Sequence, residues 1–490
     1  MGDNEPVAGE REAAAGPSSP WRLAHVLAQH TSDVKALHAC VLEPGIIDGA
    51  DMPIEALFSA SRDGTARAWV RQLSCGADGE QRRGPWGEHG AWADPQGRYL
   101  NAVHFVGGSR PQLLTAGLSG EVLVFPFPAA AQSGAPVSKG LRLSGHEANV
   151  TALHSFVDGT RHLLVSSSWD GSARTWSRAD DEETWTSLDT MWHDCAVWDA
   201  SVCGVHEGEP RVLTSGADRF VRLFHGSSLV RVWAGHDDVV RALVPLNEPR
   251  VLDGAMPEFY AAESLFLTTS NDGSARVWSL DERRSPPGVP TSGGEALRVL
   301  STPREPFVYA AAAQGSLAAT AGEEGAVRLW SWESAALQDT IAQPSISIWA
   351  VALLPCGDLA AASNTGRICM YTTGHAEDGE VDEAERRAHD EACAEVVKRT
   401  QRSGGPTAEV IAASGDAAPQ NERQLLDGVP YDAVLCIDVS DDAPPLQLGL
   451  NAADDAHEAA LAFVAKHSLP DSYVAQIEDF IQLVAPRVAR

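Results

Sequence analysis

The side chains that could do chemistry in this chain are histidines, hydroxyl residues and aspartates that recur together. His236, Thr269 and Asp272 are the three residue types of a hydrolytic triad. The same types return along the chain, for example between His146 and Asp170. An active site would not be repeated in this way, whereas buried polar groups that brace a repeated unit must be paired in every copy. We therefore interpret the recurring set as structural rather than catalytic.

Other catalytic signatures are missing from the sequence. It contains no phosphate-binding Gly-Lys-Ser/Thr loop, no dinucleotide glycine fingerprint, no His-Glu-x-x-His and no Gly-x-Ser-x-Gly. The eight cysteines are scattered without a Cys-x-x-Cys pair, which argues against a zinc site or a disulfide framework and indicates a reducing compartment. We expect a protein that is not an enzyme and that needs no metal and no cofactor.

The elements that must position the recurring set are copies of one unit. Three clear copies, each with an Asp-Gly hairpin turn followed by an alternating strand, are 268–278, 59–69 and 166–176. Four weaker copies, at 115–125, 214–224, 320–330 and 361–371, bring the total to seven. A Gly-His or related pair precedes several of them, as at Gly235-His236. A unit that returns at intervals of roughly 40 to 56 residues indicates a repeat architecture.

At these residues the chain resembles the WD-repeat proteins. The resemblance implies an all-β, seven-bladed WD-repeat β-propeller. Each blade of that family is braced by a His–Ser/Thr–Asp–Trp hydrogen-bond network, and the residues that match it here are His236, Thr269, Asp272 and Trp278.

The two ends of the repeat region predict how the ring closes. A strand at 23–28 precedes the first unit, whereas the seventh unit ends near Tyr371 without an outer strand. We expect the strand at 23–28 to complete the seventh blade, which closes the propeller over residues 21–372 and removes its exposed edges.

Segments outside the repeats differ in composition. Residues 1–20 are rich in Ala, Gly, Pro and Ser, which predicts a disordered N-terminus. The inserts at 71–96 and 283–294 are rich in Gly and Pro and predict surface loops. Residues 373–428 predict an acidic, partly helical linker, whose helix at 380–399 has too little apolar face to be buried.

A small α+β C-terminal module is predicted over residues 429–490. Strands are expected at 433–439 and 446–448, followed by one helix from about residue 453 to 467 and another from Pro470. Phe463 and Phe480 fall at core-facing helical positions, and in so small a module they could serve both the core and a contact surface.

Charge and hydropathy restrict the classes of partner. The 490 residues carry 37 Lys and Arg against 67 Asp and Glu, a formal net charge of −30. Such a field repels nucleic acid and anionic membranes and favours basic partners, although acidity also simply keeps a protein in solution. No apolar run approaches the length of a membrane span, so we expect no nucleic-acid binding and no membrane insertion.

A narrower resemblance rests on phrases within single blades and on the C-terminal module. The phrases are 99–103, 193–199 and 344–349 in the propeller, and 442–448, 451–455 and 469–473 with Phe463 and Phe480 in the module. Together they resemble the phospholipase A-2-activating protein family of ubiquitin-binding WD-repeat proteins. The resemblance to that family's PFU-type module covers only the later half of the module.

The resemblance implies partners and a location. It implies binding to ubiquitin and ubiquitinated proteins, in the cytoplasm and nucleus. The family's C-terminal armadillo-like (PUL-type) domain docks an AAA ATPase segregase, valosin-containing protein. The sequence shows no such domain, which puts direct docking of that ATPase in doubt.

Five residues next to the His and Asp marks are the candidates for contact with ubiquitin on the propeller. The loops that carry these marks share one face of a closed ring, which brings together Asp33, Arg62, Asn149, Trp169 and Asn271. Asp33 matches the acidic position after the family's first His mark, although an exposed charge that caps a turn would look the same. Trp198 and Trp349 lie within inner strands, where packing is the more common role.

These observations leave three functions open. The first is a non-catalytic ubiquitin-binding adaptor in ubiquitin-dependent degradation or sorting and in ubiquitin homeostasis. The second is a generic WD-repeat interaction scaffold that does not bind ubiquitin. The third is a propeller-fold hydrolase with a site in the central channel.

Overall fold

The computed structural model describes 14 stretches of the chain, which form two units. The stretches are 20–47, 50–75, 81–127, 136–246, 265–280, 291–292, 296–302, 307–374, 381–402, 424–426, 429–431, 433–437, 446–450 and 455–467. The first unit ends at Gly405 and the second begins at Pro406. The predicted disorder at 1–20, the insert at 283–294 and the helix from Pro470 lie largely or wholly outside these stretches.

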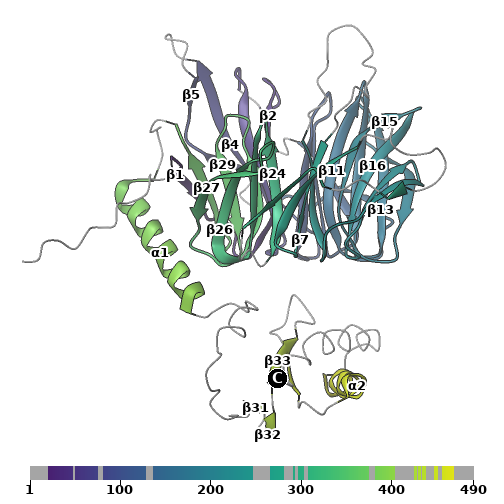
Figure 1. The fold of residues 1–490 in the computed structure, drawn as a ribbon. Coiled ribbons are helices and arrows are strands. Elements are labelled where there is room, and N and C mark those ends of the chain that lie inside the picture. Colours follow the sequence, from purple (N-terminus) through teal and green to yellow (C-terminus); the bar gives the residue numbers. More distant parts are fainter. Residues whose placement is uncertain are drawn as a thin grey trace, which may run out of the picture. The chain divides into compact units, whose positions relative to one another are not determined.

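Seven sheets make up the first unit, and their strands are antiparallel except for one short strand at the edge of blade 4 (Figure 1). Blade 1 consists of β2 (Val34–Leu42), β3 (Ile54–Ser61), β4 (Thr65–Cys75) and β6 (Gly87–Ala93). Blade 2 consists of β7 (Leu100–Val106), β8 (Gln112–Gly117), β9 (Val122–Pro126) and β10 (Leu141–Leu143). Blade 3 consists of β11 (Val150–Asp158), β12 (Arg161–Ser168), β13 (Ser172–Ala179) and β14 (Thr186–Trp192).

Blades 4 to 7 repeat the pattern. Blade 4 consists of β15 (Val197–His206), β16 (Glu209–Gly216), β17 (Val221–His225) and β18 (Ser228–Trp233), with β22 (Thr291–Ser292) added at the edge, parallel to β18, and blade 5 of β19 (Val240–Pro245), β20 (Leu265–Ser270), β21 (Ser274–Ser279) and β23 (Arg298–Ser301). Blade 6 consists of β24 (Val308–Gln314), β25 (Leu317–Gly322), β26 (Ala326–Ser331) and β27 (Ala336–Ala342). Blade 7 consists of β28 (Ile348–Leu353), β29 (Leu359–Ser363), β30 (Ile368–Thr372) and β1 (Arg22–Leu27).

The apolar cores lie between consecutive blades rather than inside them. Each of seven clusters of buried side chains joins two neighbouring sheets, from the blade 1–2 cluster around Phe58 and Phe105 to the blade 7–1 cluster around Met370 and Trp69. A strand with both faces buried in this way reads as a nearly continuous apolar run, as β3 and β8 do. The predicted seven-bladed WD-repeat β-propeller is confirmed.

The ring closes as predicted, with the chain's first strand completing the last blade. β1 pairs antiparallel with β30, so Leu23 lies opposite Tyr371 and Leu27 opposite Ile368. A second link crosses the same seam, where the buried Arg71 guanidinium of blade 1 lies 2.7 Å from Glu55 and 2.6 Å from Asp358 of blade 7. Closure therefore rests on both a strand ladder and a buried ion cluster.

Two predictions about connecting segments were wrong. The insert at 71–96 is not a loop, because β4 continues to Cys75 and pairs with β5 (Gln81–Arg83) as well as with β6. The linker helix is not wholly solvent-exposed. It forms α1 (Glu383–Arg402), which docks on the ring where Arg386 Nε donates to the Leu23 carbonyl at 3.0 Å and His389 Nε2 lies 2.9 Å from the Tyr371 hydroxyl. Arg386, His389 and the buried Cys393 make this contact, and two of the three are polar, so a count of apolar positions did not detect it.

The second unit is described in a few elements. β31 (Gln424–Leu426) pairs with β32 (Val429–Tyr431), and β33 (Ala433–Ile437) pairs with β34 (Leu446–Leu450), as the sequence predicted for the latter two. The helix α2 (Ala456–His467) begins after Asp455, whose carboxylate accepts the His457 and Glu458 amides at 3.0 Å. None of the helices in the described part of the chain is both long and apolar enough to span a membrane.

Candidate binding face

Blades 1, 3 and 5 each contain a complete four-residue hydrogen-bond network. In blade 5, His236 Nδ1 lies 2.8 Å from the Asp272 carboxylate and His236 Nε2 lies 2.8 Å from the Thr268 hydroxyl, which also accepts a 2.8 Å bond from Trp278 Nε1. His30 with Ser59, Asp63 and Trp69 in blade 1, and His146 with Ser166, Asp170 and Trp176 in blade 3, repeat the arrangement.

The hydroxyl of this network belongs to Thr268 and not to the predicted Thr269, which lies one residue later. The Thr269 hydroxyl is buried and has no hydrogen-bond partner in the described part of the chain. Side chains alternate between the two faces of a strand, so neighbouring residues cannot both reach His236. In all three networks the hydroxyl residue lies ten positions before the tryptophan, and this spacing identifies Thr268 from sequence.

The networks have the connectivity of a hydrolytic triad but not its access. The three hydroxyl residues are fully buried, and each accepts the tryptophan N–H. Burial alone would raise the pKa of Asp272, but hydrogen bonds from His236 and Ser274 and the charge of His236 hold that pKa well below its usual range. The carboxylate thus remains charged and holds the turn closed. These groups brace the blades and cannot reach a substrate.

All five propeller residues proposed for binding lie at one end of the blades. In every blade the residue after the second strand donates its backbone N–H to the carbonyl of the residue just before the first strand, at 2.9 to 3.2 Å. These bonds join Arg62 to Asp33, Leu118 to Tyr99, Trp169 to Asn149, Ala217 to Ala196, Asn271 to Val239, Glu323 to Phe307 and Asn364 to Ser347. We call this end of the ring the candidate face.

Asp33 and Arg62 interact with each other on this face. The Arg62 guanidinium lies 3.4 Å from the Asp33 carboxylate, and both side chains are about one-fifth exposed. The Asp33 charge is therefore partly neutralised within the protein, which the sequence analysis did not anticipate.

A second set of residues converges on the same face, and sequence reasoning largely missed it. The second residue of every first strand sits at a β-bulge, between two residues that pair with the neighbouring strand. It is half-buried in all seven blades, whereas the residue before it is buried. We call this set the inner ring: Lys35, Asn101, Thr151, Trp198, Arg241, Tyr309 and Trp349.

Five members of the inner ring contact one another from blade to blade. The Arg241 guanidinium carbon lies 3.8 Å from the centre of the Trp198 ring and 4.9 Å from that of Tyr309. Tyr309 stacks on Trp349, with 4.9 Å between the ring centres. Lys35 Nζ lies 3.3 Å from the centre of the Trp349 ring. Both cations of the inner ring therefore lie against aromatic rings, Arg241 between Trp198 and Tyr309 and Lys35 at Trp349. Trp169 also joins this group, with its ring 5.5 Å from Trp198.

Negative charge lies farther out, on the loops that carry the histidine marks. Glu147, Asp194 and Asp237 each follow a network or mark histidine and are exposed, and Asp238 is half-buried beside them. We call these four residues the acidic rim. The face is thus not uniformly acidic, because a cationic and aromatic inner ring lies inside an acidic rim.

In the C-terminal unit the structure assigns Phe463 to the interior. Its side chain is 3% exposed and lies on the face of α2 that also buries Ala460 and Val464, so it is not a contact residue in this structure. Phe480 lies outside the described residues. The exposed apolar residue of α2 is Leu461, which the sequence analysis did not select.

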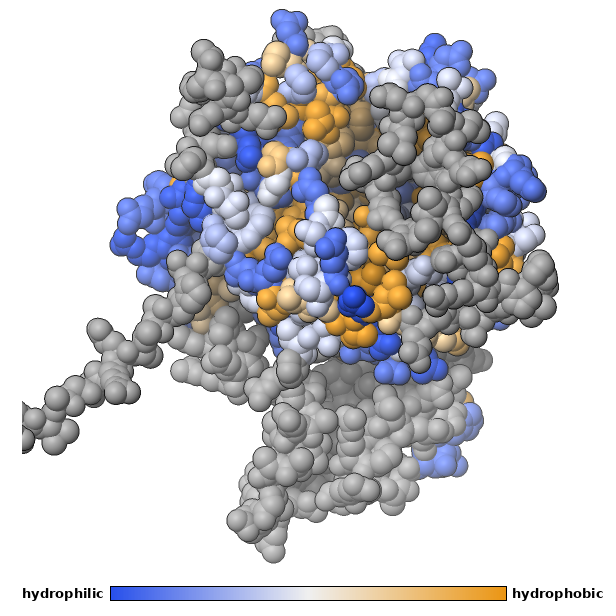
Figure 2. All heavy atoms as spheres, turned by 45° about the horizontal axis from the view of Figure 1, so that its top comes forward, coloured by the Kyte–Doolittle hydropathy of each residue, from blue (hydrophilic) through white to orange (hydrophobic). Residues whose placement is uncertain are grey.

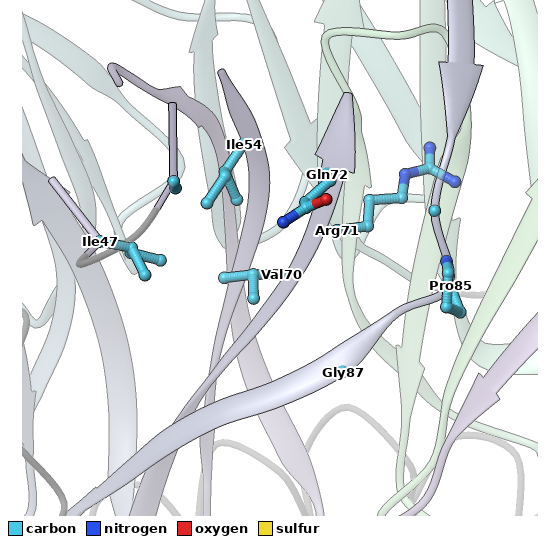
Figure 3. Close-up of a pocket in the computed structure, with 9 residues that line it drawn as sticks. Ile47, Ile54, Val70, Arg71, Gln72, Pro85 and Gly87 are labelled. Carbon is cyan, nitrogen blue, oxygen red and sulfur yellow. The ribbon is translucent and has the colours of Figure 1, made fainter. Parts of the chain in front are cut away.

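The remaining features of the propeller offer no obvious chemistry. Among the described residues, no three His, Cys, Asp or Glu side chains come together in a way that could hold a metal ion. An open cavity of about 380 Å³ lies beside β4, lined by residues such as Ile54, Val70 and Pro85 (Figure 3). β4 begins at the candidate face and ends beside β5, so the cavity lies toward the other side of the ring. Figure 2 turns that side forward and shows hydrophobic residues among hydrophilic ones.

Family models match both units. A WD domain, G-beta repeat, matches residues 138–177, which run from β10 through most of β13. A PFU domain, described as PLAA family ubiquitin binding, matches residues 394–486. This match begins inside α1, ahead of residue 429 where the sequence analysis placed the start of the module.

Curated relatives and a solved structure resemble the chain over most of its length. It is 24% identical to the ubiquitin homeostasis protein lub1 of Schizosaccharomyces pombe and 24% identical to the ubiquitin fusion degradation protein 3 homolog of Caenorhabditis elegans, in both cases over 94% of this chain. The chain spans 60% and 46% of the length of these relatives. The crystal structure of the WD40 β-propeller domain of Doa1 aligns with 72% of this chain and 97% of that domain, at a TM-score of 0.51 and 26% identity.

Proposed function

The chain belongs to the phospholipase A-2-activating protein family, and from that premise we propose that it is a non-catalytic adaptor that binds ubiquitin and ubiquitinated proteins. The role would lie in ubiquitin-dependent degradation or sorting and in ubiquitin homeostasis, in the cytoplasm and nucleus. The observation that carries the proposal is the match of residues 394–486 to a ubiquitin-binding domain.

The candidate face supports a second contact with ubiquitin, on the propeller. The surface of ubiquitin that most partners recognise is an apolar patch ringed by basic residues. The aromatic rings of Trp169, Trp198 and Trp349 suit the apolar patch, and the acidic rim suits the basic surround. We propose that Asp33, Arg62, Asn149, Trp169 and Asn271 line this contact.

Two weak contacts on one chain would favour chains of ubiquitin over single ubiquitin. A flat face with one patch binds weakly, but a second binding module on the same polypeptide raises the effective concentration of the next ubiquitin. We propose that avidity of this kind, rather than tight binding at either contact, selects ubiquitinated proteins. Any association with the AAA ATPase segregase (valosin-containing protein) is proposed to be indirect, through a ubiquitinated protein that both bind.

The rival functions make different predictions. A generic scaffold would leave the ubiquitin spectrum unchanged. A propeller hydrolase would need an accessible nucleophile, and the network hydroxyls are buried and bonded to tryptophan. A screen for turnover of ester, phosphate and peptide substrates, with and without divalent metal ions, addresses this rival directly.

The test is a titration of ¹⁵N-labelled ubiquitin with the full chain, followed by NMR. We expect shift changes confined to one surface of ubiquitin. In Asp33→Arg, two cations would face each other at the position of the present ion pair, and the propeller contact should weaken about tenfold. Asp158→Arg is the matched control, because Asp158 pairs with Arg161 at 3.0 Å in the β11–β12 turn, at the opposite end of the blade.

Each outcome has a clear meaning. No shift changes with the full chain at sub-millimolar concentration would leave only the scaffold function. Shift changes that survive Asp33→Arg at wild-type affinity would remove the candidate face from the proposal and leave the PFU match as its sole support.

A further inference from the structure

We propose that the inner ring is a receptor for a carboxylate side chain with an aliphatic neighbour, presented by a partner protein. This inference builds on the proposed function, because it specifies the chemical group that the candidate face contacts at its centre. The partner would therefore carry a negative group within a positive surround.

The backbone of the propeller directs the inner-ring side chains toward one place. The same bulged position supplies one half-buried side chain from each of seven blades, so these side chains are directed to one place by the backbone. A bulge re-aims a side chain without disturbing the rest of the ladder. The first residue of each strand remains in the core, as Val34 and Ile348 show. The arrangement presents functional groups on a rigid support.

Three buried donors on the candidate face have no acceptor among the residues that the structure describes. Two of them are the indole N–H groups of Trp198 and Trp349. The third is Nδ2 of Asn149, a residue that is 2% exposed and whose Oδ1 accepts a 2.8 Å hydrogen bond from Asn101 of the inner ring. Buried donors without acceptors are rare and costly. These three groups are donors and favour an acceptor as the ligand group at the inner ring, whereas Asn271 Oδ1 on the same face, which is unpaired within the described residues, is an acceptor and would take a donor such as a peptide N–H.

The charges on the candidate face also favour an anionic ligand at the inner ring. The inner ring has two side chains that are ionised at neutral pH, Lys35 and Arg241, and both are cations. Arg241 contacts the ring of Tyr309, and Lys35 contacts the ring of Trp349. Two carboxylates on the candidate face already have partners, since Glu323 accepts a 2.7 Å hydrogen bond from the Tyr309 hydroxyl and Asp33 lies 3.4 Å from Arg62. The other negative charges described on this face form the acidic rim. An acidic group at the centre is therefore attracted, whereas a long polyanion would have to cross the rim and is repelled.

An apolar surface of aromatic rings lies beside the two cations of the inner ring. Trp198, Tyr309 and Trp349 present half-buried rings, which match an aliphatic side chain next to the carboxylate. A carboxylate alone would use only the donors and cations, whereas a Leu–Glu pair would use both kinds of surface. This chemistry selects a protein segment over a free anion.

The experiment uses the full chain and blocked hexapeptides in which the central pair varies. The probes are acetylated, amidated Gly-Gly-Leu-Glu-Gly-Gly and its counterparts with Gln or Lys in place of Glu, observed by saturation-transfer NMR. We expect the Glu peptide to bind with a dissociation constant in the millimolar range, and the Gln and Lys peptides to bind at least about tenfold more weakly. Equal binding of the Glu and Gln peptides would overturn the proposal.

Matched variants locate the binding. The double variant Lys35→Gln/Arg241→Gln should reduce affinity for the Glu peptide to that of the Gln peptide. The control Arg110→Gln/Arg161→Gln removes the same charge from turns at the other end of blades 2 and 3, where both guanidinium groups are partly exposed. Thermal melts verify that both variants are folded. An unchanged affinity in the first variant, or an equal loss in the control, would contradict the assignment.

Two further arms separate this inference from its alternatives. If octathymidylate binds as tightly as the Glu peptide and loses binding in the same variant, the ring is a phosphate site and the peptide assignment falls. Ubiquitin titrated into the same variants distinguishes the two proposals. Ubiquitin binding with no discrimination among peptides leaves the proposed function standing alone, and peptide discrimination without ubiquitin binding leaves the inner ring standing alone.

Discussion

At the scale of single residues, the position of one hydroxyl group decides whether a blade is braced. The Thr268 hydroxyl bridges His236 and Trp278, whereas the hydroxyl of Thr269 is buried without a partner. The two threonines are equally buried and adjacent in one strand, but they point to opposite faces and their hydroxyls differ in hydrogen bonding. This pair offers an internal comparison.

We expect Thr268→Val to destabilise the propeller by about 2 to 4 kcal/mol, because it leaves both an imidazole nitrogen and an indole N–H buried and unpaired. Thr269→Val should be neutral or slightly stabilising, since it replaces a buried, unbonded hydroxyl with a methyl group. Urea unfolding followed by tryptophan fluorescence measures both. Equal losses in the two variants would show that strand packing, and not the hydrogen bonds, sets the cost.

At the scale of elements, the first strands of blades 1 to 3 each carry a histidine at one shared position, and of these His104 is buried whereas His38 and His154 are half-buried. His38 lies 4.1 Å from His104, ring centre to ring centre, and His104 lies 5.7 Å from His154. Burial, with the charge of a neighbouring histidine, lowers the pKa of His38 from 6.5 to about 4, and burial lowers that of His154 to about 4. Burial and its two neighbours lower the pKa of His104 as well.

These shifts determine the sign of the pH dependence. Below pH 6.5 the unfolded chain takes up protons that the folded chain does not accept until about pH 4, so stability falls as pH falls through this window. Asp199 acts in the opposite direction, because burial raises its pKa from 3.8 to about 7 even though amides of Leu243 and Ala200 donate to it. Because three histidines destabilise the fold as pH falls and one aspartate stabilises it, we expect a net loss of stability on acidification.

The resulting prediction is a loss of stability between pH 7 and pH 5 that depends on these imidazoles. Each such group contributes up to about 1.4 kcal/mol per pH unit within its window. His38→Phe should flatten the profile, and replacement of the exposed His206 by Asn should not. Urea midpoints at pH 7, 6 and 5 are the measurement. A profile unchanged by His38→Phe would mean that this imidazole is not held neutral in the folded state.

At the scale of the whole propeller, stability depends on closure by the chain's own beginning. β1 pairs with β30, contributes Leu23 to the blade 6–7 core and contributes Leu27 to the blade 7–1 core. It also receives contacts from α1 and from the residues just before that helix: the Leu23 carbonyl accepts Arg386 of α1, and the Ala24 carbonyl accepts the amide of Val381, two residues before α1, at 2.8 Å. Strand and helix therefore support the same seam.

Deletion of residues 1–27 should lower the melting temperature markedly and cause association, because it exposes the edge of β30 and removes apolar contacts from two cores. Deletion of residues 1–19, which leaves β1 in place, is the control and should change neither property. Calorimetry and light scattering after size-exclusion chromatography report the two effects. A monomeric 1–27 deletion that melts like the control would mean that the other three strands suffice for blade 7.

The sequence by itself determined the repeat, the number of blades and the strand that closes the ring. Asp-Gly turns and alternating strands are local signals that can be read from the sequence. The repeat region begins with one extra strand and ends with a blade that lacks its outer strand, so the first completes the last. Only the tertiary structure decided the choice of Thr268 over Thr269, the docking of α1 and the inner ring. These depend on strand faces, bulges and contacts between residues far apart in the chain, and no local pattern encodes where such residues meet.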